Sequence, residues 1–519
     1  MRLRRLFSGS AEAASPGPTS QRQGVPLGVR GGESVVRVDD RGVLHSDSRW
    51  SLRWWIGTED GWHDPATRVG VRQSFRSGTP VIETALRVPG GDARATTWAA
   101  RTAHGSSAVL EVRNERPASF GLALIVGPAP ELEVHGCLVT SGDMPILALE
   151  RPPADVLAAT AVEQLWDELA SSGGSTMPMG AVDGYLALVY PIAHTTGLRV
   201  SVALDGLVTA PGDVPDADAV GRGWQRQLGE ATRLVLPDAE LEHLITAQRC
   251  YLLSDPAPVS PAVDAAVALQ LARFDHVVEA RRRLDTVLLD GTPTEVVEAA
   301  AAYVRLDPEV APGLVEPAIV ALGKIGRRRM VAEAGYLEAV ASIFEAAGRD
   351  DEAKTLREGA PRLASRTSQP MTATTTLSWQ EMRATASSVG TWPSTAGHDP
   401  LQAAGLLAAV VSALIDDTDP ARLDLLPGWI ELWRGQGVEI HGLAISAGQL
   451  SLALRWHGER PALLWEIEPN VAGVRRGVPT LLCSSLDPSW QGSGWRGEAL
   501  LGLPRSEDPM PFDPGDSFS

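Results

Sequence analysis

The chain has 519 residues, more than one hydrophobic core usually serves, so roughly two to four domains are expected. Apolar residues make up 44% and charged residues 21%, an ordinary globular composition, and the formal net charge is −18 at pH 7. This acidity argues against a nucleic-acid partner, because neutralising phosphates requires a basic surface. The longest apolar run, residues 405–415, is far shorter than the roughly 20 residues that a membrane span needs, so no span is predicted.

The two ends of the chain lack the composition of a folded core. Residues 1–24 combine a short basic start with a polar, proline-rich stretch and no apolar segment, so we expect disorder and no secretory signal. Residues 504–519 are also expected to be disordered. Cys137, Cys250 and Cys483 lie far apart, in neither a disulfide framework nor a zinc pattern. A reducing cytoplasm is the location these features predict.

Residues 25–218 carry short strand patterns separated by Gly, Pro and Asp turns. Apolar and polar residues alternate over 81–88, which is typical of a strand with one buried face in an antiparallel sheet. The predicted strands are 34–38, 50–55, 69–75, 81–88, 93–100, 108–113, 120–126, 184–190 and 198–205. A short helix is predicted over 159–170. Strands that recur about every ten to twelve residues predict a β-sandwich.

Residues 219–416 form a helical block in this interpretation. Pro237-Asp238 and Asp399-Pro400 are helix-start signals, because Asp caps a first turn and Pro fits it. The predicted helices are 218–230, 239–253, 261–273, 276–289, 294–304, 312–325, 328–347, 350–359, 379–386 and 401–415. Short connections between them favour antiparallel hairpins. A Ser- and Thr-rich stretch, 365–378, is expected to be an exposed connection.

Residues 417–503 return to a β pattern, with strands predicted at 438–441, 451–456, 462–467 and 480–483. The predicted fold class is therefore multidomain α+β. It has an N-terminal antiparallel β-sandwich, a central block of α/α helical hairpins and a small C-terminal β-domain.

Four segments resemble one known family. Residues 425–469, LLPGWIELWRGQGVEIHGLAISAGQLSLALRWHGERPALLWEIEP, resemble the closing domain of actinobacterial six-hairpin glycosidase-like (glucoamylase-like) proteins. Residues 486–501 resemble that family's tail. Residues 70–100 resemble its N-terminal sandwich, and residues 223–253 the linker that enters its α/α toroid.

The resemblance implies a ring of helical hairpins whose mouth admits sugars, with carboxylates acting as general acid and base. Residues 238–415 are too short for the complete ring, so a partial toroid is expected. Two interpretations stay open. One is a carbohydrate-related protein that is a glycoside hydrolase, or a degenerate, inactive relative that binds an oligosaccharide. The other is a non-catalytic interaction or scaffold protein that uses the hairpins and the sandwich, with no protein partner specified.

Glu316 is the candidate catalytic acid of the helical block. It lies in the apolar segment Leu314-Val315-Glu316-Pro317, where burial would raise the pKa of a carboxyl group. The alternative is a carboxylate near a helix start or in a surface ion pair. Glu333, Glu338 and Glu345 follow at helical spacing, which is typical of a solvated face.

A second candidate site is the segment WWIGTEDGWHD. It combines aromatic faces, which stack on sugar rings, with carboxylates, which accept hydrogen bonds from hydroxyls. The candidate ligand-binding residues are Trp54, Trp55, Glu59, Asp60, Trp62 and His63. The alternative is that the tryptophans seal the sandwich core. The Asp60/His63 pair lacks the further ligands of a metal site, so no metal is predicted. No Walker loop or dinucleotide motif is present, and no cofactor is predicted.

Overall fold

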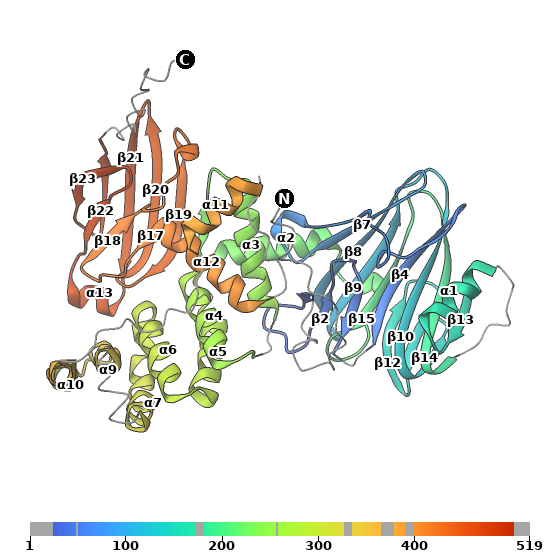
Figure 1. Ribbon diagram of the computed structural model, residues 1–519, viewed down its shortest axis with the longest axis horizontal. Coiled ribbons are helices and arrows are strands. Elements are labelled where there is room, and N and C mark those ends of the chain that lie inside the picture. The colour runs from blue at the N-terminus through green and yellow to red at the C-terminus, as the bar shows by residue number, and fades with distance from the viewer. Residues whose placement is uncertain are drawn as a thin grey trace, which may run out of the picture.

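The computed structural model describes residues 24–47, 50–171, 180–255, 258–325, 335–364, 378–389 and 399–502. Two β-rich parts lie at opposite ends of the molecule with helices between them (Figure 1). The mixed helix-and-sheet class predicted from the sequence is confirmed. The expected disorder at both ends, the start of the 328–347 helix with Glu333, and nearly all of the 365–378 connection lie outside the described residues.

The N-terminal part, which the sequence predicted to be a β-sandwich, is one large antiparallel sheet that curls around its own core. We keep the word sandwich for this curled sheet. Its strands are β1 (Val25–Leu27), β2 (Val36–Val38), β3 (Leu44–Ser46), β4 (Ser51–Thr58), β5 (Gly61–His63), β6 (Val71–Phe75), β7 (Ile82–Val88), β8 (Gly91–Thr102), β9 (Gly105–Asn114), β10 (Phe120–His135), β11 (Leu138–Ser141), β12 (Met144–Leu149), β13 (Asp155–Ala159), β14 (Gly180–Ile192) and β15 (Gly197–Ala203). Along β7 every second residue is buried, as the alternation predicted. Leu86, Leu122 and Trp54 are among the side chains that fill the interior.

Some elements of this part have no clear pattern in the sequence. In β11 only Val139 is buried, so no apolar alternation marks the strand. The helix predicted over 159–170 is α1 (Val162–Ser171), which starts later because β13 runs to Ala159 and pairs with β14.

The helices form an open row of hairpins within the described ranges. After the lead-in helix α2 (Ala217–Glu230), the helices are α3 (Ala239–Ser254), α4 (Pro261–Arg273), α5 (Val277–Asp290), α6 (Pro293–Leu306), α7 (Ala311–Lys324), α9 (Gly335–Ala346), α10 (Asp350–Ala364), α11 (Trp379–Val389) and α12 (Pro400–Leu414). The hairpins α4/α5, α6/α7 and α9/α10 stack through α4, α6 and α9, and α12 packs on α3 and α4. The hairpin prediction is confirmed.

Helix starts follow the expected capping chemistry. The carboxylate of Asp238 accepts a hydrogen bond from Leu241 N at the start of α3, and that of Asp399 accepts one from Leu401 N at the start of α12. Thr292 and Glu295 form a reciprocal capping box at α6. These caps satisfy backbone groups that would otherwise lack partners, which explains why the helix boundaries could be predicted.

The C-terminal part consists of two sheets. One has the order β16-β19-β20-β21-β24, the other β17-β18-β22-β23. The strands are β16 (Arg233–Val235), β17 (Ile415–Asp416), β18 (Arg422–Leu425), β19 (Val438–Ile445), β20 (Gly448–His457), β21 (Arg460–Pro469), β22 (Thr480–Cys483), β23 (Asp487–Gly492) and β24 (Arg496–Leu500), with helix α13 (Val471–Arg476) after β21. The helices and these sheets share one apolar core, whereas the N-terminal sandwich has its own.

Strand β16 joins distant parts of the chain. It lies in the linker between α2 and α3, and it pairs antiparallel with β19, Arg233 opposite His441. A three-residue edge strand carries no alternation pattern, so the sequence did not predict it. Through this pairing the linker becomes the edge of the C-terminal sheet. Among the described residues, no helix has the length and apolar character that crossing a membrane requires.

Candidate ligand-binding site

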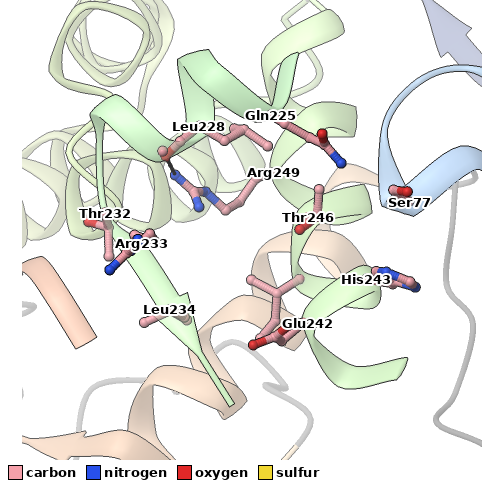
Figure 2. A pocket seen from close by; sticks show the side chains of 12 residues that line it. Ser77, Gln225, Leu228, Thr232, Arg233, Leu234, Glu242, His243, Thr246 and Arg249 are labelled. Carbon is pink, nitrogen blue, oxygen red and sulfur yellow. Dashed lines mark hydrogen bonds between the residues drawn. The ribbon is translucent and has the colours of Figure 1, made fainter. Parts of the chain in front are cut away.

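A hollow of about 320 Å³ lies where the linker meets the sandwich, and we call it the linker pocket (Figure 2). Its walls are α2, β16, α3 and the turn Arg76–Gly78 of the sandwich. The lining residues are Ser77, Gln225, Leu228, Gly229, Thr232, Arg233, Leu234, Glu242, His243, Ile245, Thr246 and Arg249. Because β16 is an edge strand of the C-terminal sheet, all three parts of the chain contribute to this pocket.

The turn Arg76–Gly78 packs directly on α3. Gly78 has a φ of +71°, and a Cβ at this position would lie 2.5 Å from the carbonyl oxygen of His243. Only glycine fits both the left-handed backbone and this close approach. Arg76 forms ion pairs with Glu83 and with Asp218 of α2. These contacts fix the sandwich side of the linker pocket.

Helix α3 presents one polar stripe to the linker pocket. Glu242, Thr246 and Arg249 are spaced by four and three residues, so they lie on the same face of the helix. Figure 2 shows these side chains facing the space between α3 and the α2–β16 linker. Arg249 is 5% exposed and lies toward Leu228 of α2.

The guanidinium of Arg249 has neutral partners. Its Nη2 donates to the carbonyl oxygen of Leu228 at 3.1 Å and to Nε2 of His276 at 3.0 Å. The ring of Phe274 lies 4.9 Å from the guanidinium carbon. Within the described ranges, Arg249 forms no ion pair with a carboxylate. Burial lowers the pKa of Arg249 to about 10, so it is still a cation at neutral pH.

His276 is fully buried and neutral. Because a guanidinium can only donate, Nε2 of His276 accepts and its ring proton is on Nδ1. Burial lowers the pKa of His276 to about 2, with additional contributions from the charges of Arg249 and Arg30. His276 therefore adds no charge beside Arg249 at physiological pH.

Glu242 and Arg233 are the other charged residues that line the linker pocket. Oε1 of Glu242 accepts a hydrogen bond from Leu236 N at 2.5 Å. Glu242 precedes Arg249 by seven residues, which corresponds to about 10 Å along the helix axis. Arg233 lies 3.0 Å from the imidazole of His441. The linker pocket thus has an acidic end and a basic end.

The predicted catalytic acid Glu316 is placed away from this pocket. It lies on α7 with its side chain exposed, so the apolar surroundings expected from the sequence are missing. Glu338 and Glu345 form ion pairs with Arg357 on α10, and the solvated face predicted for them is confirmed.

The tryptophans of the predicted WWIGTEDGWHD site serve mainly to pack the protein interior. Trp54 and Trp55 are 0% and 1% exposed. Because neighbouring residues of a strand point to opposite faces, Trp54 enters the sandwich core and Trp55 packs under α1, edge-on to Trp166 at 5.1 Å. Neither ring has a face on which a sugar could stack.

The polar members of this cluster are held by local hydrogen bonds. Nε1 of Trp62 donates to the carbonyl oxygen of Leu169, which ties the β4–β5 hairpin to α1. His63 is buried and lies 2.9 Å from a carboxylate oxygen of Asp60. Glu59 is exposed and accepts two hydrogen bonds from Nη2 of Arg116.

A second hollow, the acidic hollow, lies between helices α4–α6 and strands β20–β21. It has a volume of about 410 Å³, and four carboxylates line it: Asp275, Asp307, Glu309 and Glu468. Burial raises the pKa of Asp275, and Gln449 donates to it at 3.3 Å. Asp307 pairs with Arg281 at 2.7 Å. The sequence did not reveal this group because its members are far apart in the chain. Among the described residues, no group of three or more His, Cys, Asp or Glu is arranged to hold a metal ion.

Comparison with known proteins finds similarity to solved structures. No protein-family model and no curated protein sequence matches the chain. One of the solved structures to which it is similar is a bacterial glucoamylase, crystallised in complex with acarbose. The sequence identity is 12%, the match covers 69% of each chain, and the TM-score is 0.48.

Proposed function

We propose that this chain is a glycosidase-like, carbohydrate-related protein that binds a sugar derivative in the linker pocket without cleaving it. The lining of the pocket carries the proposal. The amide of Gln225, the imidazole of His243 and the hydroxyl of Thr246 have no hydrogen-bond partner within the described part of the chain. Such groups match the hydroxyls of a sugar, which both donate and accept hydrogen bonds.

The carboxylates of the linker pocket support binding over hydrolysis. Cleavage of a glycosidic bond uses a pair of carboxylates about 5 to 9.5 Å apart, one on each side of the bond. Glu242 is the only carboxylate among the described residues that line the linker pocket, and Leu236 N already donates to it. A single carboxylate held in this way lacks the second member of the pair.

The test combines binding with bond cleavage on the full chain. A glycan array that carries neutral and acidic oligosaccharides would be probed first, and reducing-sugar release would then be measured with every glycan that binds. We expect binding without release. Release that persists in a highly purified preparation and disappears on substitution of a pocket or hollow carboxylate would refute the proposal.

The acidic hollow supports a second candidate, a glycoside hydrolase. Asp275 is the observation in its favour, because a carboxyl group whose pKa burial raises is suited to donate a proton to a leaving group. Asp307 and Glu309 line the same hollow. In this case Asp275→Asn would abolish sugar release, while Glu242→Gln would leave it intact.

The row of hairpins supports the third candidate, an interaction scaffold. Leu289 of α5 and Ile319 and Val320 of α7 are exposed by 83%, 45% and 49%. Exposed aliphatic side chains on neighbouring hairpins are typical of helical arrays that bind other proteins. Replacing all three by Ser would weaken association with a protein partner and would leave glycan binding unchanged.

A further inference from the structure

We propose that the ligand of the linker pocket carries an oxyanion, a carboxylate or a phosphate, and that Arg249 binds it. This inference rests on the proposed function for the sugar part of the ligand. The inference that the ligand carries an oxyanion depends only on the geometry around Arg249.

Two other buried arginines of this protein are each neutralised by a carboxylate of the protein itself. The side chains of Arg37 and Arg283 are 6% and 7% exposed, and each is 2.7 Å from a carboxylate, Asp255 and Asp264 respectively. Arg249 is buried to the same degree, but its partners are a carbonyl, a neutral imidazole and an aromatic ring. A desolvated cation is costly unless an anion compensates it. Arg249 differs from the other two in lining an open hollow, from which a ligand can supply that anion.

The surroundings of Arg249 suit an oxyanion. A guanidinium presents a planar set of donors that matches carboxylate and phosphate oxygens. Thr246 lies one turn before Arg249 on α3, and Gln225 lines the same pocket from α2. Both side chains can donate a hydrogen bond, and neither has a partner within the described residues. The linker pocket therefore offers an anionic ligand the charged donor of Arg249, and neutral donors elsewhere in its lining.

At the opposite end of the linker pocket, Glu242 determines which chemical groups the remainder of the ligand can carry. Glu242 repels a second anion but accepts hydrogen bonds from hydroxyls. Since Glu242 and Arg249 are about 10 Å apart along α3, one molecule can span both ends. The chemical class that fits is a sugar with an anionic group at one end and hydroxyls at the other, such as a uronic acid or a sugar phosphate.

The experiment measures binding by isothermal titration calorimetry on the full chain. The probes are inorganic phosphate, glucuronate and the neutral trisaccharide maltotriose. We expect phosphate or glucuronate to bind, and Arg249→Met to weaken that binding by about tenfold or more, because hydrogen bonds to charged groups contribute strongly. The matched control is Arg305→Met, which removes an exposed arginine of α6 and should leave affinity unchanged.

A second variant keeps the test decisive if Arg249→Met does not fold. Thr246→Glu leaves Arg249 in place and puts a carboxylate one turn away, so it should abolish anion binding while the protein stays folded. Binding of phosphate alone or of glucuronate alone supports the inference and identifies the oxyanion.

Three results would overturn the inference. One is anion binding that neither variant changes, and another is the absence of binding by any probe. The third is maltotriose binding without anion binding, which would leave the proposed function standing and remove only the oxyanion.

Discussion

Arg283 and Arg249 are both buried in the helical block, yet their electrostatic surroundings differ. Nη1 of Arg283 on α5 donates to Asp264 at 2.7 Å, and its Nη2 donates to the carbonyl oxygen of Asp255. The carboxylate of Asp255 in turn accepts from Arg37 of β2 at 2.7 Å. This closed network joins the sandwich to the helices. Arg249, on α3, lines the linker pocket and forms no such ion pair among the described residues.

The difference shows that burial alone does not assign a role to a charged side chain. A buried charge whose partner belongs to the protein contributes to folding, and removing either partner leaves the other desolvated and unpaired. A buried charge without a protein counter-ion is available to a ligand, at some cost to the empty protein. Substitutions of Arg283 and of Arg249 distinguish a buried charge that stabilises the fold from one that is available to a ligand.

The largest expected effect follows from breaking the closed network. Arg283→Met leaves the carboxylate of Asp264, which is 0% exposed, without its guanidinium. We expect the free energy of unfolding to fall by about 3 to 5 kcal/mol. Urea denaturation followed by circular dichroism measures it, with Arg305→Met as the exposed control. A loss no larger than that of the control would show that the pair contributes little.

The next effect concerns the pH dependence that His276 adds. Its pKa in the folded protein is about 2, below its ordinary value of 6.5, so below pH 6.5 only the unfolded state takes up this proton. The stabilisation from His276 is full above pH 6.5 and is lost as the pH falls, by about 1.4 kcal/mol per unit. Between pH 7.5 and 5, wild type should lose about 2 kcal/mol more than His276→Gln. Equal losses in the two proteins would contradict a buried, neutral imidazole.

A smaller effect is expected for the arginine that faces the linker pocket. Arg249→Met removes a costly desolvated charge but leaves the Leu228 carbonyl oxygen and His276 Nε2 without a donor. These contributions oppose each other, so the free energy of unfolding of the ligand-free protein should change by no more than about 1 kcal/mol. Denaturation beside Arg283→Met makes the comparison direct. A loss as large as that of Arg283→Met would assign Arg249 a structural role.

The smallest effect is expected at Glu316, which is exposed on α7. Glu316→Gln should change the free energy of unfolding by less than about 0.5 kcal/mol, as surface substitutions usually do. It should also leave glycan binding and any sugar release unchanged. If sugar release is observed and this variant abolishes it, the catalytic role predicted from the sequence would be restored.

The sequence predicted most helices and many strands because their signals are local. Asp238 and Asp399 cap helices that begin where the pattern places them, and Leu86 lies on the buried face of an alternating strand. Strand periodicity also places Trp54 and Trp55 on opposite faces of β4, which already argues against a shared sugar platform. Capping, turn chemistry and periodicity each depend on a few neighbouring residues, so one sequence is enough to reveal them.

The candidate site depends on segments that are far apart in the chain. Arg249 stands next to apolar residues at the end of α3, and this hinted at burial, but no pattern shows that it lacks a carboxylate partner. That property depends on Leu228, His276 and the β16–β19 pairing, which only the folded chain brings together. The sequence by itself determined the elements and their order along the chain. The tertiary structure decided which charges are paired and which face a hollow, because the strength of an electrostatic interaction depends on distance and burial in space.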